Sequence, residues 1–183
     1  MVLTVYLEKI MKNKILLSLA IFFLIFCFIV LFKSLDNSNI YVPDSISEKP
    51  LINFNSQDLF SNKKISSDKI FTDSEFYILN IWASWCLPCR NEHSYLMEFN
   101  KNSSIKLIGL NYKDNLNSAK KFISEFGNPY SVNIVDSNGT ISIKLGAYGV
   151  PETFLINKER KIIKKIVGPL NRKLVKEINL IIK

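Results

Sequence analysis

The apolar positions of this chain form one long run followed by several short ones. Residues 15–32 are apolar apart from Ser18, and a helix of this length nearly spans the hydrocarbon core of a bilayer. Residues 34–49 are rich in Asn, Ser and Asp, a composition typical of a tether. We therefore predict a transmembrane anchor at 15–33, a linker at 34–49 and a folded domain at 50–183.

The charges beside the long apolar run predict its orientation. Lys9, Lys12 and Lys14 precede the run, and acidic residues predominate after it. The positive-inside rule then places residues 1–14 in the cytoplasm and the folded domain outside. A cleaved signal peptide would need a shorter apolar core and a cleavage site with small residues, which residues 30–32 do not provide. The pattern therefore favours an uncleaved, single-pass anchor.

Shorter apolar runs alternate with a helical pattern in the rest of the chain. The uncharged, aromatic-rich run 76–82 predicts a buried central strand, and 105–110 predicts a second strand. Residues 86–100 between them are compatible with a helix, which implies a right-handed parallel crossover. Near the C-terminus, 154–156 and 162–163 flank a charged turn and predict a hairpin.

Two further helices are predicted from apolar residues at helical spacing. The first covers 116–126, with Asp114 as its expected N-cap and Gly127 at its C-terminal stop. The second begins after Asn171 and runs towards the C-terminus. Residues 51–71 mix short apolar pieces with polar ones and predict a short hairpin or an irregular lead-in. Together these elements predict an α/β fold with a central mixed sheet and helices on both faces.

Charge is unevenly distributed along the chain, whose formal net charge is +8. Residues 158–183 carry nine basic and two acidic residues. This stretch is either a surface for nucleic acid or anionic lipid, or a solvated face on a terminal helix and hairpin. It contains no aromatic residue that would stack on bases, which favours the solvated face and no nucleic-acid partner.

The most informative local feature is the pair Cys86 and Cys89, between the apolar run 76–82 and the helical stretch after it. Two cysteines at this spacing can close a small disulfide ring. Cys86 would lie at a helix N-terminus, where unpaired N–H groups and the positive end of the helix dipole stabilise a thiolate. We expect Cys86 to be exposed and nucleophilic. Pro88 is tolerated because first-turn N–H groups have no partner within the helix.

Half of a zinc site is the main alternative for this pair of cysteines. A structural zinc site normally takes four Cys and His ligands. The chain has three cysteines and one histidine, and Cys27 lies in the long apolar run as a lipid-facing residue. Only Cys86, Cys89 and His93 remain, one ligand short. We therefore predict no metal site here and expect His93 to be a hydrogen-bonded surface residue.

Several segments together carry a resemblance to a known family. They are W-A-S-W-C-L-P-C-R at 82–90 with N-E-H after it, G-L-N-Y-K-D at 109–114, G-N-P-Y at 127–130 and Y-G-V-P-E-T-F at 148–154. In these segments the predicted domain resembles the CcmG/DsbE family, the thiol:disulfide interchange proteins of cytochrome c biogenesis. The resemblance implies a thioredoxin-like fold, preceded by one N-terminal transmembrane helix.

The resemblance also implies roles for residues around the two cysteines. Cys86 would be the attacking thiolate, and Cys89, one turn on and facing inward, would be the resolving thiol. Pro151 would follow a cis peptide bond opposite the C-x-x-C loop. The backbone of Val150 would then be free to pair with an extended substrate strand. Trp85 would pack at the rim of the site.

Two carboxylates flank these motifs, and the resemblance suggests that they make the surroundings of the thiols acidic. A nearby carboxylate raises the pKa of a thiol and can relay a proton. The alternatives are a solvated helix residue for Glu92 and a loop residue for Glu152. Many thioredoxins have a buried acid beneath the active site, and the matching residue here is Asn80, which cannot titrate. This departure makes Glu152 the better candidate for a relay.

The leading functional hypothesis is a periplasmic thiol-disulfide oxidoreductase held in the bacterial inner membrane. The resemblance implies that it reduces the cysteines of apocytochrome c before haem attachment, beside the haem-ligation components. It would be re-reduced by a membrane thiol donor of the CcdA/DsbD type. The redox-active Cys86–Cys89 disulfide would serve without a separate cofactor.

Two alternatives remain open for the function. One keeps the fold but makes the protein a general periplasmic disulfide reductant or oxidant. The other is a copper metallochaperone that uses Cys86, Cys89 and His93, since soft thiolates suit Cu(I). Copper chaperones of this fold usually separate their cysteines by three residues, whereas two separate them here.

Overall fold

The computed structural model describes residues 2–36 and 48–182, with side chains described for 14–33 and 48–182. The chain divides into an N-terminal unit and a larger compact unit. Most of the predicted linker at 34–49 lies outside the described residues.

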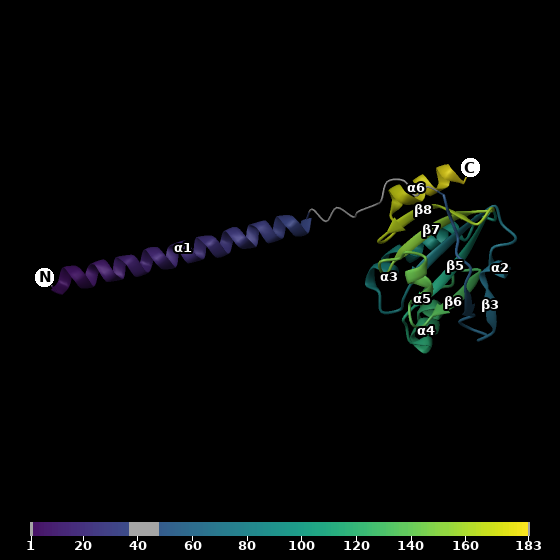
Figure 1. Cartoon of the computed structure of the whole chain (residues 1–183), viewed down its shortest axis with the longest axis horizontal. Coiled ribbons are helices and arrows are strands. Elements are labelled where there is room, and N and C mark those ends of the chain that lie inside the picture. The colour runs from purple at the N-terminus through teal and green to yellow at the C-terminus, as the bar shows by residue number, and fades with distance from the viewer. Residues whose placement is uncertain (1, 37–47, 183) are drawn as a thin grey trace. The chain divides into compact units, whose positions relative to one another are not determined.

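The N-terminal unit contains the helix α1, Val2–Asp36 (Figure 1). Its segment Lys14–Lys33 has a mean hydropathy of 3.3, and none of it is buried against protein. Among the described residues, it is the one helix long and apolar enough to cross a membrane. This agrees with the length and composition expected of the anchor at 15–33.

The larger unit is built on a six-stranded mixed sheet in the order β1-β8-β7-β4-β5-β6. The central β4 is parallel to β5 and antiparallel to β7, and β5 is parallel to β6. The outer pairs β7–β8 and β1–β8 are antiparallel. The strands are β1 Lys49–Pro50, β4 Phe76–Trp82, β5 Ile105–Tyr112, β6 Val132–Asp136, β7 Glu152–Asn157 and β8 Lys161–Val167. A separate hairpin joins β2, Asn55–Gln57, to β3, Lys64–Ser66.

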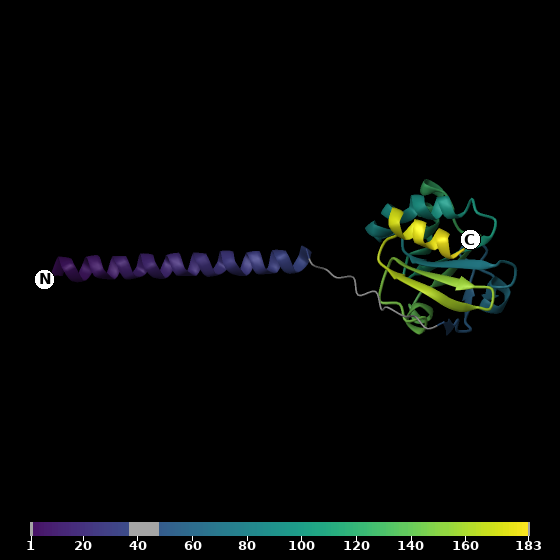
Figure 2. The same ribbon diagram turned by 90° about the horizontal axis from the view of Figure 1, so that it is seen from above.

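Helices cover both faces of the sheet, and each face has its own hydrophobic cluster. One cluster includes residues of α3 (Leu87–Phe99), α4 (Leu116–Phe126) and α6 (Arg172–Ile181). Figure 2 shows α6, in yellow, on the same side of the sheet as the teal helices. The opposite cluster includes residues of α2 (Ser67–Ile70) and α5 (Thr140–Lys144). The predicted mixed sheet with helices on both faces is confirmed.

The main strands and helices agree with the sequence pattern, with one wrong cap and four short elements missed. Asn115, rather than Asp114, is the N-cap of α4, because its side chain accepts hydrogen bonds from the backbone N–H groups of Asn117 and Ser118. The carboxylate of Asp114 instead accepts hydrogen bonds from Ser84, in the turn before Cys86. The short elements β1, α2, β6 and α5 were not predicted from the sequence.

Acidic side chains, most of them from other parts of the fold, pair with most of the basic residues of the C-terminal stretch 158–183. The ion pairs are Lys158–Glu75, Arg160–Asp68, Lys161–Glu48, Lys164–Glu177, Lys165–Glu152 and Arg172–Glu98. These ion pairs interrupt the continuous positive surface that would attract a polyanion. These pairs support the interpretation of 158–183 as an ordinary protein surface.

Candidate active site

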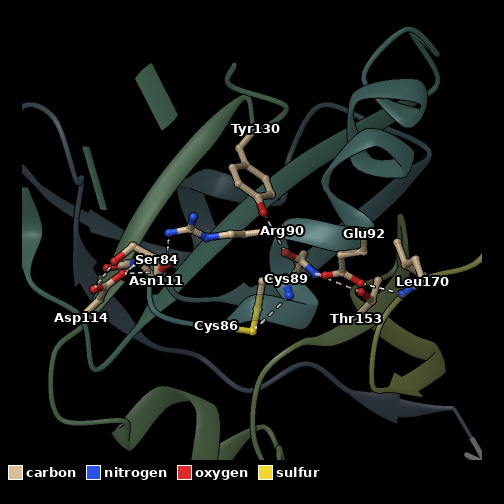
Figure 3. The surroundings of a disulfide bond; sticks show 11 residues. Ser84, Cys86, Cys89, Arg90, Glu92, Asn111, Asp114, Tyr130, Thr153 and Leu170 are labelled. Carbon is tan, nitrogen blue, oxygen red and sulfur yellow. Dashed lines mark hydrogen bonds between the residues drawn. A yellow bond between two sulfur atoms is a disulfide. The ribbon is translucent and has the colours of Figure 1, made fainter. Parts of the chain in front are cut away.

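The two cysteines lie where the central strand β4 leads into α3, and a disulfide joins them (Figure 3). Cys86 is the N-cap residue of α3, and its sulfur accepts a hydrogen bond from the backbone N–H of Cys89, with an N–Sγ distance of 3.2 Å. Pro88 stands in the first turn, where its missing N–H leaves no helical hydrogen bond unmade. After reduction, the same N–H and the helix dipole would stabilise a thiolate on Cys86.

Cys86 is less exposed in this oxidised form than the sequence predicted. Only 3% of the residue is accessible, because it packs in the hydrophobic cluster beneath α3 together with Cys89. Its neighbours are different: Trp85 is 59% exposed and Leu87 is 67% exposed. The disulfide therefore has an apolar rim, which suits a polypeptide substrate.

The predicted cis peptide bond between Val150 and Pro151 is present. Val150 packs against the same cluster that contains both cysteines. The carbonyl of Pro151 accepts a hydrogen bond from the N–H of Gly168, at 3.0 Å, which ties this loop to the segment after β8. The structure therefore brings the C-x-x-C turn and the Val150–Pro151 loop together around one core.

Glu92 is buried, in contrast to the alternative of a solvated helix residue. Its carboxylate accepts hydrogen bonds from the backbone N–H of Leu170 at 2.6 Å and from Nδ2 of Asn80 at 2.8 Å. Desolvation outweighs these two favourable bonds and raises the pKa of Glu92 to about 7. Because Glu92 follows Cys89 by three residues on α3, the two side chains lie on neighbouring positions of one helix face.

Glu152 lies on the other face of the sheet. It pairs in register with Ile81, whereas the next residue, Thr153, pairs with Asn80 and accepts a hydrogen bond from the same Nδ2 that binds Glu92. Since adjacent residues of a strand point to opposite faces, the carboxylate of Glu152 points away from α3. This placement speaks against Glu152, and for Glu92, as the acid beneath the thiols.

The carboxylate of Glu152 instead holds the loop that precedes the cis peptide bond. It accepts hydrogen bonds from the backbone N–H groups of Tyr148 and Gly149, and it pairs with Lys165 at 3.0 Å. Lys165 also donates to the carbonyl of Gly146 at 2.7 Å and lies 3.8 Å from the centroid of the Tyr148 ring. The buried ion pair therefore fixes the backbone that leads into Val150.

A second set of polar contacts, not predicted from the sequence, fixes the turn before Cys86. Asp114 accepts hydrogen bonds from the backbone N–H of Ser84 at 2.6 Å and from its hydroxyl at 2.7 Å. The guanidinium of Arg90 donates to the carbonyl of Ser84 at 3.1 Å (Figure 3). The indole of Trp85 donates to the carbonyl of Lys113 at 3.2 Å. The G-L-N-Y-K-D segment therefore supports the redox turn.

His93 is buried, not on the surface as predicted. Its Nε2 is 3.1 Å from the carbonyl of Gly127, and its ring packs edge-on against Phe122 and Phe126. Burial lowers the pKa of His93. Within the part of the chain that the structure describes, no three His, Cys, Asp or Glu side chains are grouped as metal ligands. The geometry does not favour a copper site that includes His93.

Comparisons with known proteins agree with this geometry. Residues 46–180 match the family model described as Redoxin. The thiol:disulfide interchange protein DsbE of Escherichia coli K12 is 33% identical over 91% of this chain and 92% of its own length. The DsbE protein of Vibrio cholerae is 42% identical over 67% of this chain and 66% of its own.

Solved structures support the fold independently. The thioredoxin domain of a thiol-disulfide oxidoreductase from Bacteroides vulgatus superposes with a TM-score of 0.64 at 18% identity. That match covers 76% of this chain and all of the other. The fold is therefore thioredoxin-like, and the relatives establish its chemistry as thiol-disulfide exchange. The chain belongs to the DsbE family of thiol:disulfide interchange proteins, within the wider redoxin family.

Proposed function

We propose that this thiol-disulfide oxidoreductase works in the periplasm and reduces the paired cysteines of apocytochrome c before haem is attached. The observation that carries the redox role is the N-cap position of Cys86, whose sulfur accepts the N–H of Cys89. The substrate is proposed from the resemblance to the cytochrome c biogenesis family. The redox group is the cysteine pair itself, and we propose no further cofactor.

The exchange would proceed in two thiolate attacks. In the reduced protein, the thiolate of Cys86 attacks one sulfur of the substrate disulfide, and the other substrate sulfur leaves as a thiolate. Cys89 then loses its proton and attacks the sulfur of Cys86. The Cys86–Cys89 bond forms, the mixed disulfide breaks, and the second substrate sulfur leaves. Two electrons pass from the protein to the substrate.

Glu92 is the candidate acceptor for the proton of Cys89. It is buried on the same face of α3, and its pKa of about 7 lets it take up and release a proton near neutral pH. The contact with the N–H of Leu170 holds one carboxylate oxygen, while Asn80 holds the other. In this proposal Glu92 performs the role of the buried acid of many thioredoxins, whose matching position in this chain is occupied by Asn80.

Two sets of groups around the disulfide would bind the substrate. The backbone of Val150 would pair with an extended segment beside the disulfide, as in strand addition. The exposed side chains of Trp85, Leu87 and Tyr148 would cover the apolar neighbours of its cysteines. Because these contacts suit any extended peptide, the identity of the trapped protein tests selectivity for apocytochrome c.

The anchor would keep the oxidoreductase beside its membrane partners. With α1 in the inner membrane and residues 1–14 in the cytoplasm, the folded domain would face the periplasm. A membrane dithiol carrier of the CcdA/DsbD type would supply the two electrons that re-reduce the Cys86–Cys89 disulfide. Haem-ligation components would receive the reduced apocytochrome.

Trapping the substrate tests this proposal. We expect Cys89→Ser to accumulate a mixed disulfide on Cys86, because the thiol that resolves the intermediate is absent. Periplasmic and membrane extracts would be resolved on non-reducing gels, and the adducts would be identified by mass spectrometry. Cys86→Ser is the control and should trap far less protein.

The identity of the trapped proteins separates the candidate functions. Apocytochrome c or a haem-ligation component as the main adduct would support the proposed substrate. A spread of unrelated periplasmic proteins would favour a general disulfide reductant or oxidant. Absence of any adduct, together with one copper ion bound per chain, would contradict the exchange role and favour the metallochaperone.

A further inference from the structure

The turn Gly127 to Tyr130, singled out by the sequence, brings a tyrosine beneath the redox site. The Tyr130 ring stacks on Trp82, with centroids 5.8 Å apart and an interplanar angle of 18°. Gly109 makes room for it, since a Cβ there would lie 2.7 Å from the Tyr130 ring. The exchange steps described above do not use this tyrosine.

The hydroxyl of Tyr130 is linked to Glu92 through one buried amide. Oη of Tyr130 donates to Oδ1 of Asn80 at 2.7 Å. Nδ2 of Asn80 donates to Glu92 at 2.8 Å and to the hydroxyl of Thr153 at 3.1 Å. In Figure 3 the dashed lines follow this path from Tyr130 towards Glu92 and Thr153. All these side chains are buried, so water does not compete for the bonds.

The two ends of the Asn80 amide are chemically different, and this gives the tyrosine its effect. An ionised carboxylate only accepts hydrogen bonds, so it is stabilised when the NH₂ end of the amide faces it. A flipped amide would turn its oxygen towards Glu92 and suit only the protonated acid. Tyr130 occupies the oxygen end. Burial, followed by the charge of Glu92, raises the pKa of Tyr130, so this hydroxyl keeps its proton while Glu92 titrates.

We propose that Tyr130 is a positioning residue, which holds the Asn80 amide with Nδ2 towards Glu92 and so favours the ionised form of that acid. Removal of the Tyr130 hydroxyl leaves Oδ1 of Asn80 without its donor. The amide can then turn, so that Oδ1 accepts a hydrogen bond from protonated Glu92. The kinetic importance of this effect rests on the role proposed above for Glu92, whereas the positioning itself does not.

Other titratable groups around Glu92 leave this interpretation intact. On its own helix, Cys89 is held in the disulfide, and His93 turns to Gly127. From β7, the charged Glu152 points to the other face of the sheet. From α6, Arg172 pairs with Glu98. From the turn after α4, Tyr130 is the titratable group that faces the Asn80 amide.

The test follows the titration of Glu92 in the oxidised full-length protein in detergent micelles. With glutamate labelled by ¹³C at Cδ, the resonance missing from Glu92→Gln identifies the carboxyl. We expect Tyr130→Phe to raise the pKa of Glu92 from about 7 to about 8, a tenfold gain in proton affinity. Tyr77→Phe is the matched control, because it removes another buried hydroxyl, bonded to Ser74, on the opposite face.

A double variant shows whether Tyr130 acts through the amide. In an Asn80→Ala background, we expect Tyr130→Phe to add nothing further to the pKa of Glu92. The proposal would be overturned if the pKa of Glu92 were unchanged in Tyr130→Phe, or if it rose only as much as in Tyr77→Phe. This comparison tests the proposal even if the double variant does not fold. A full additional rise in the Asn80→Ala background would overturn it too. The disulfide stays intact throughout, so the result is independent of the proposed substrate.

Discussion

Cys86→Ser is expected to slow reduction of a peptide disulfide by about a thousandfold or more. The serine hydroxyl cannot replace a thiolate as nucleophile, and Cys89 lacks the N-cap position that stabilises one. The measurement is a single turnover, in which pre-reduced protein meets a fluorescent peptide disulfide in excess. Full-length protein in detergent micelles is used, with free reductant removed beforehand.

The chain offers a matched control for this loss. Cys27 lies in the apolar segment of α1, so Cys27→Ser makes the same atomic change outside the folded domain that carries the redox cysteines. We expect its rate to equal that of the unmodified protein. A Cys86→Ser protein that keeps more than a tenth of the rate would show that another group performs the first attack.

Glu92 is expected to make the oxidised protein less stable as the pH rises. Its pKa is about 7 in the folded protein against 4.5 for an ordinary glutamate carboxyl in water, so between these pH values the folded state holds a proton that the unfolded state has lost. Stability falls with pH wherever the folded state binds more protons. The contribution of Glu92 to the free energy of unfolding should therefore drop by about 3 kcal/mol between pH 4 and pH 8.

The comparison with Glu92→Gln isolates this contribution from those of the other carboxylates. Denaturant unfolding would be measured from pH 4 to pH 8 without reductant. We expect the glutamine variant to gain stability relative to the unmodified protein as the pH rises, and the difference to level off above about pH 7. A constant difference for Glu92→Gln would mean that this carboxyl titrates as it does in water.

The elements predicted correctly are those with long, regular apolar patterns. The run 76–82 became β4, and the helical spacing at 116–126 became α4. The missed strand β6 has only five residues, and the polar Asn133 lies within it. Its partner is β5, so the pairing that makes it a strand comes from tertiary structure. The cap of α4 differs from prediction because Asp114 binds Ser84, thirty residues away.

At the site, the motifs located the cysteines and Pro151, but they favoured Glu152 as the acid, whereas the structure places Glu92 on the face of the sheet that carries the cysteines. The partners of Glu92 are Asn80 and Leu170, which are distant in sequence and give no local signal. Helical spacing held a usable signal, since Glu92 lies on the same face of α3 as Cys89 and Leu96. For Glu152, strand alternation after the cis peptide bond would have indicated the opposite face.

The assignment of Cys86 as the reactive thiol of the pair is tested most directly by the order in which the two cysteines are alkylated. The fully reduced full-length protein would be treated briefly with iodoacetamide at pH 7, quenched and mapped by peptide mass spectrometry. The position of Cys86 at the N-terminus of α3 predicts that it is modified at least about tenfold faster than Cys89, which lies within the first turn and does not have the N-cap position. Equal rates, or faster modification of Cys89, would contradict the assignment of Cys86 as the attacking thiolate.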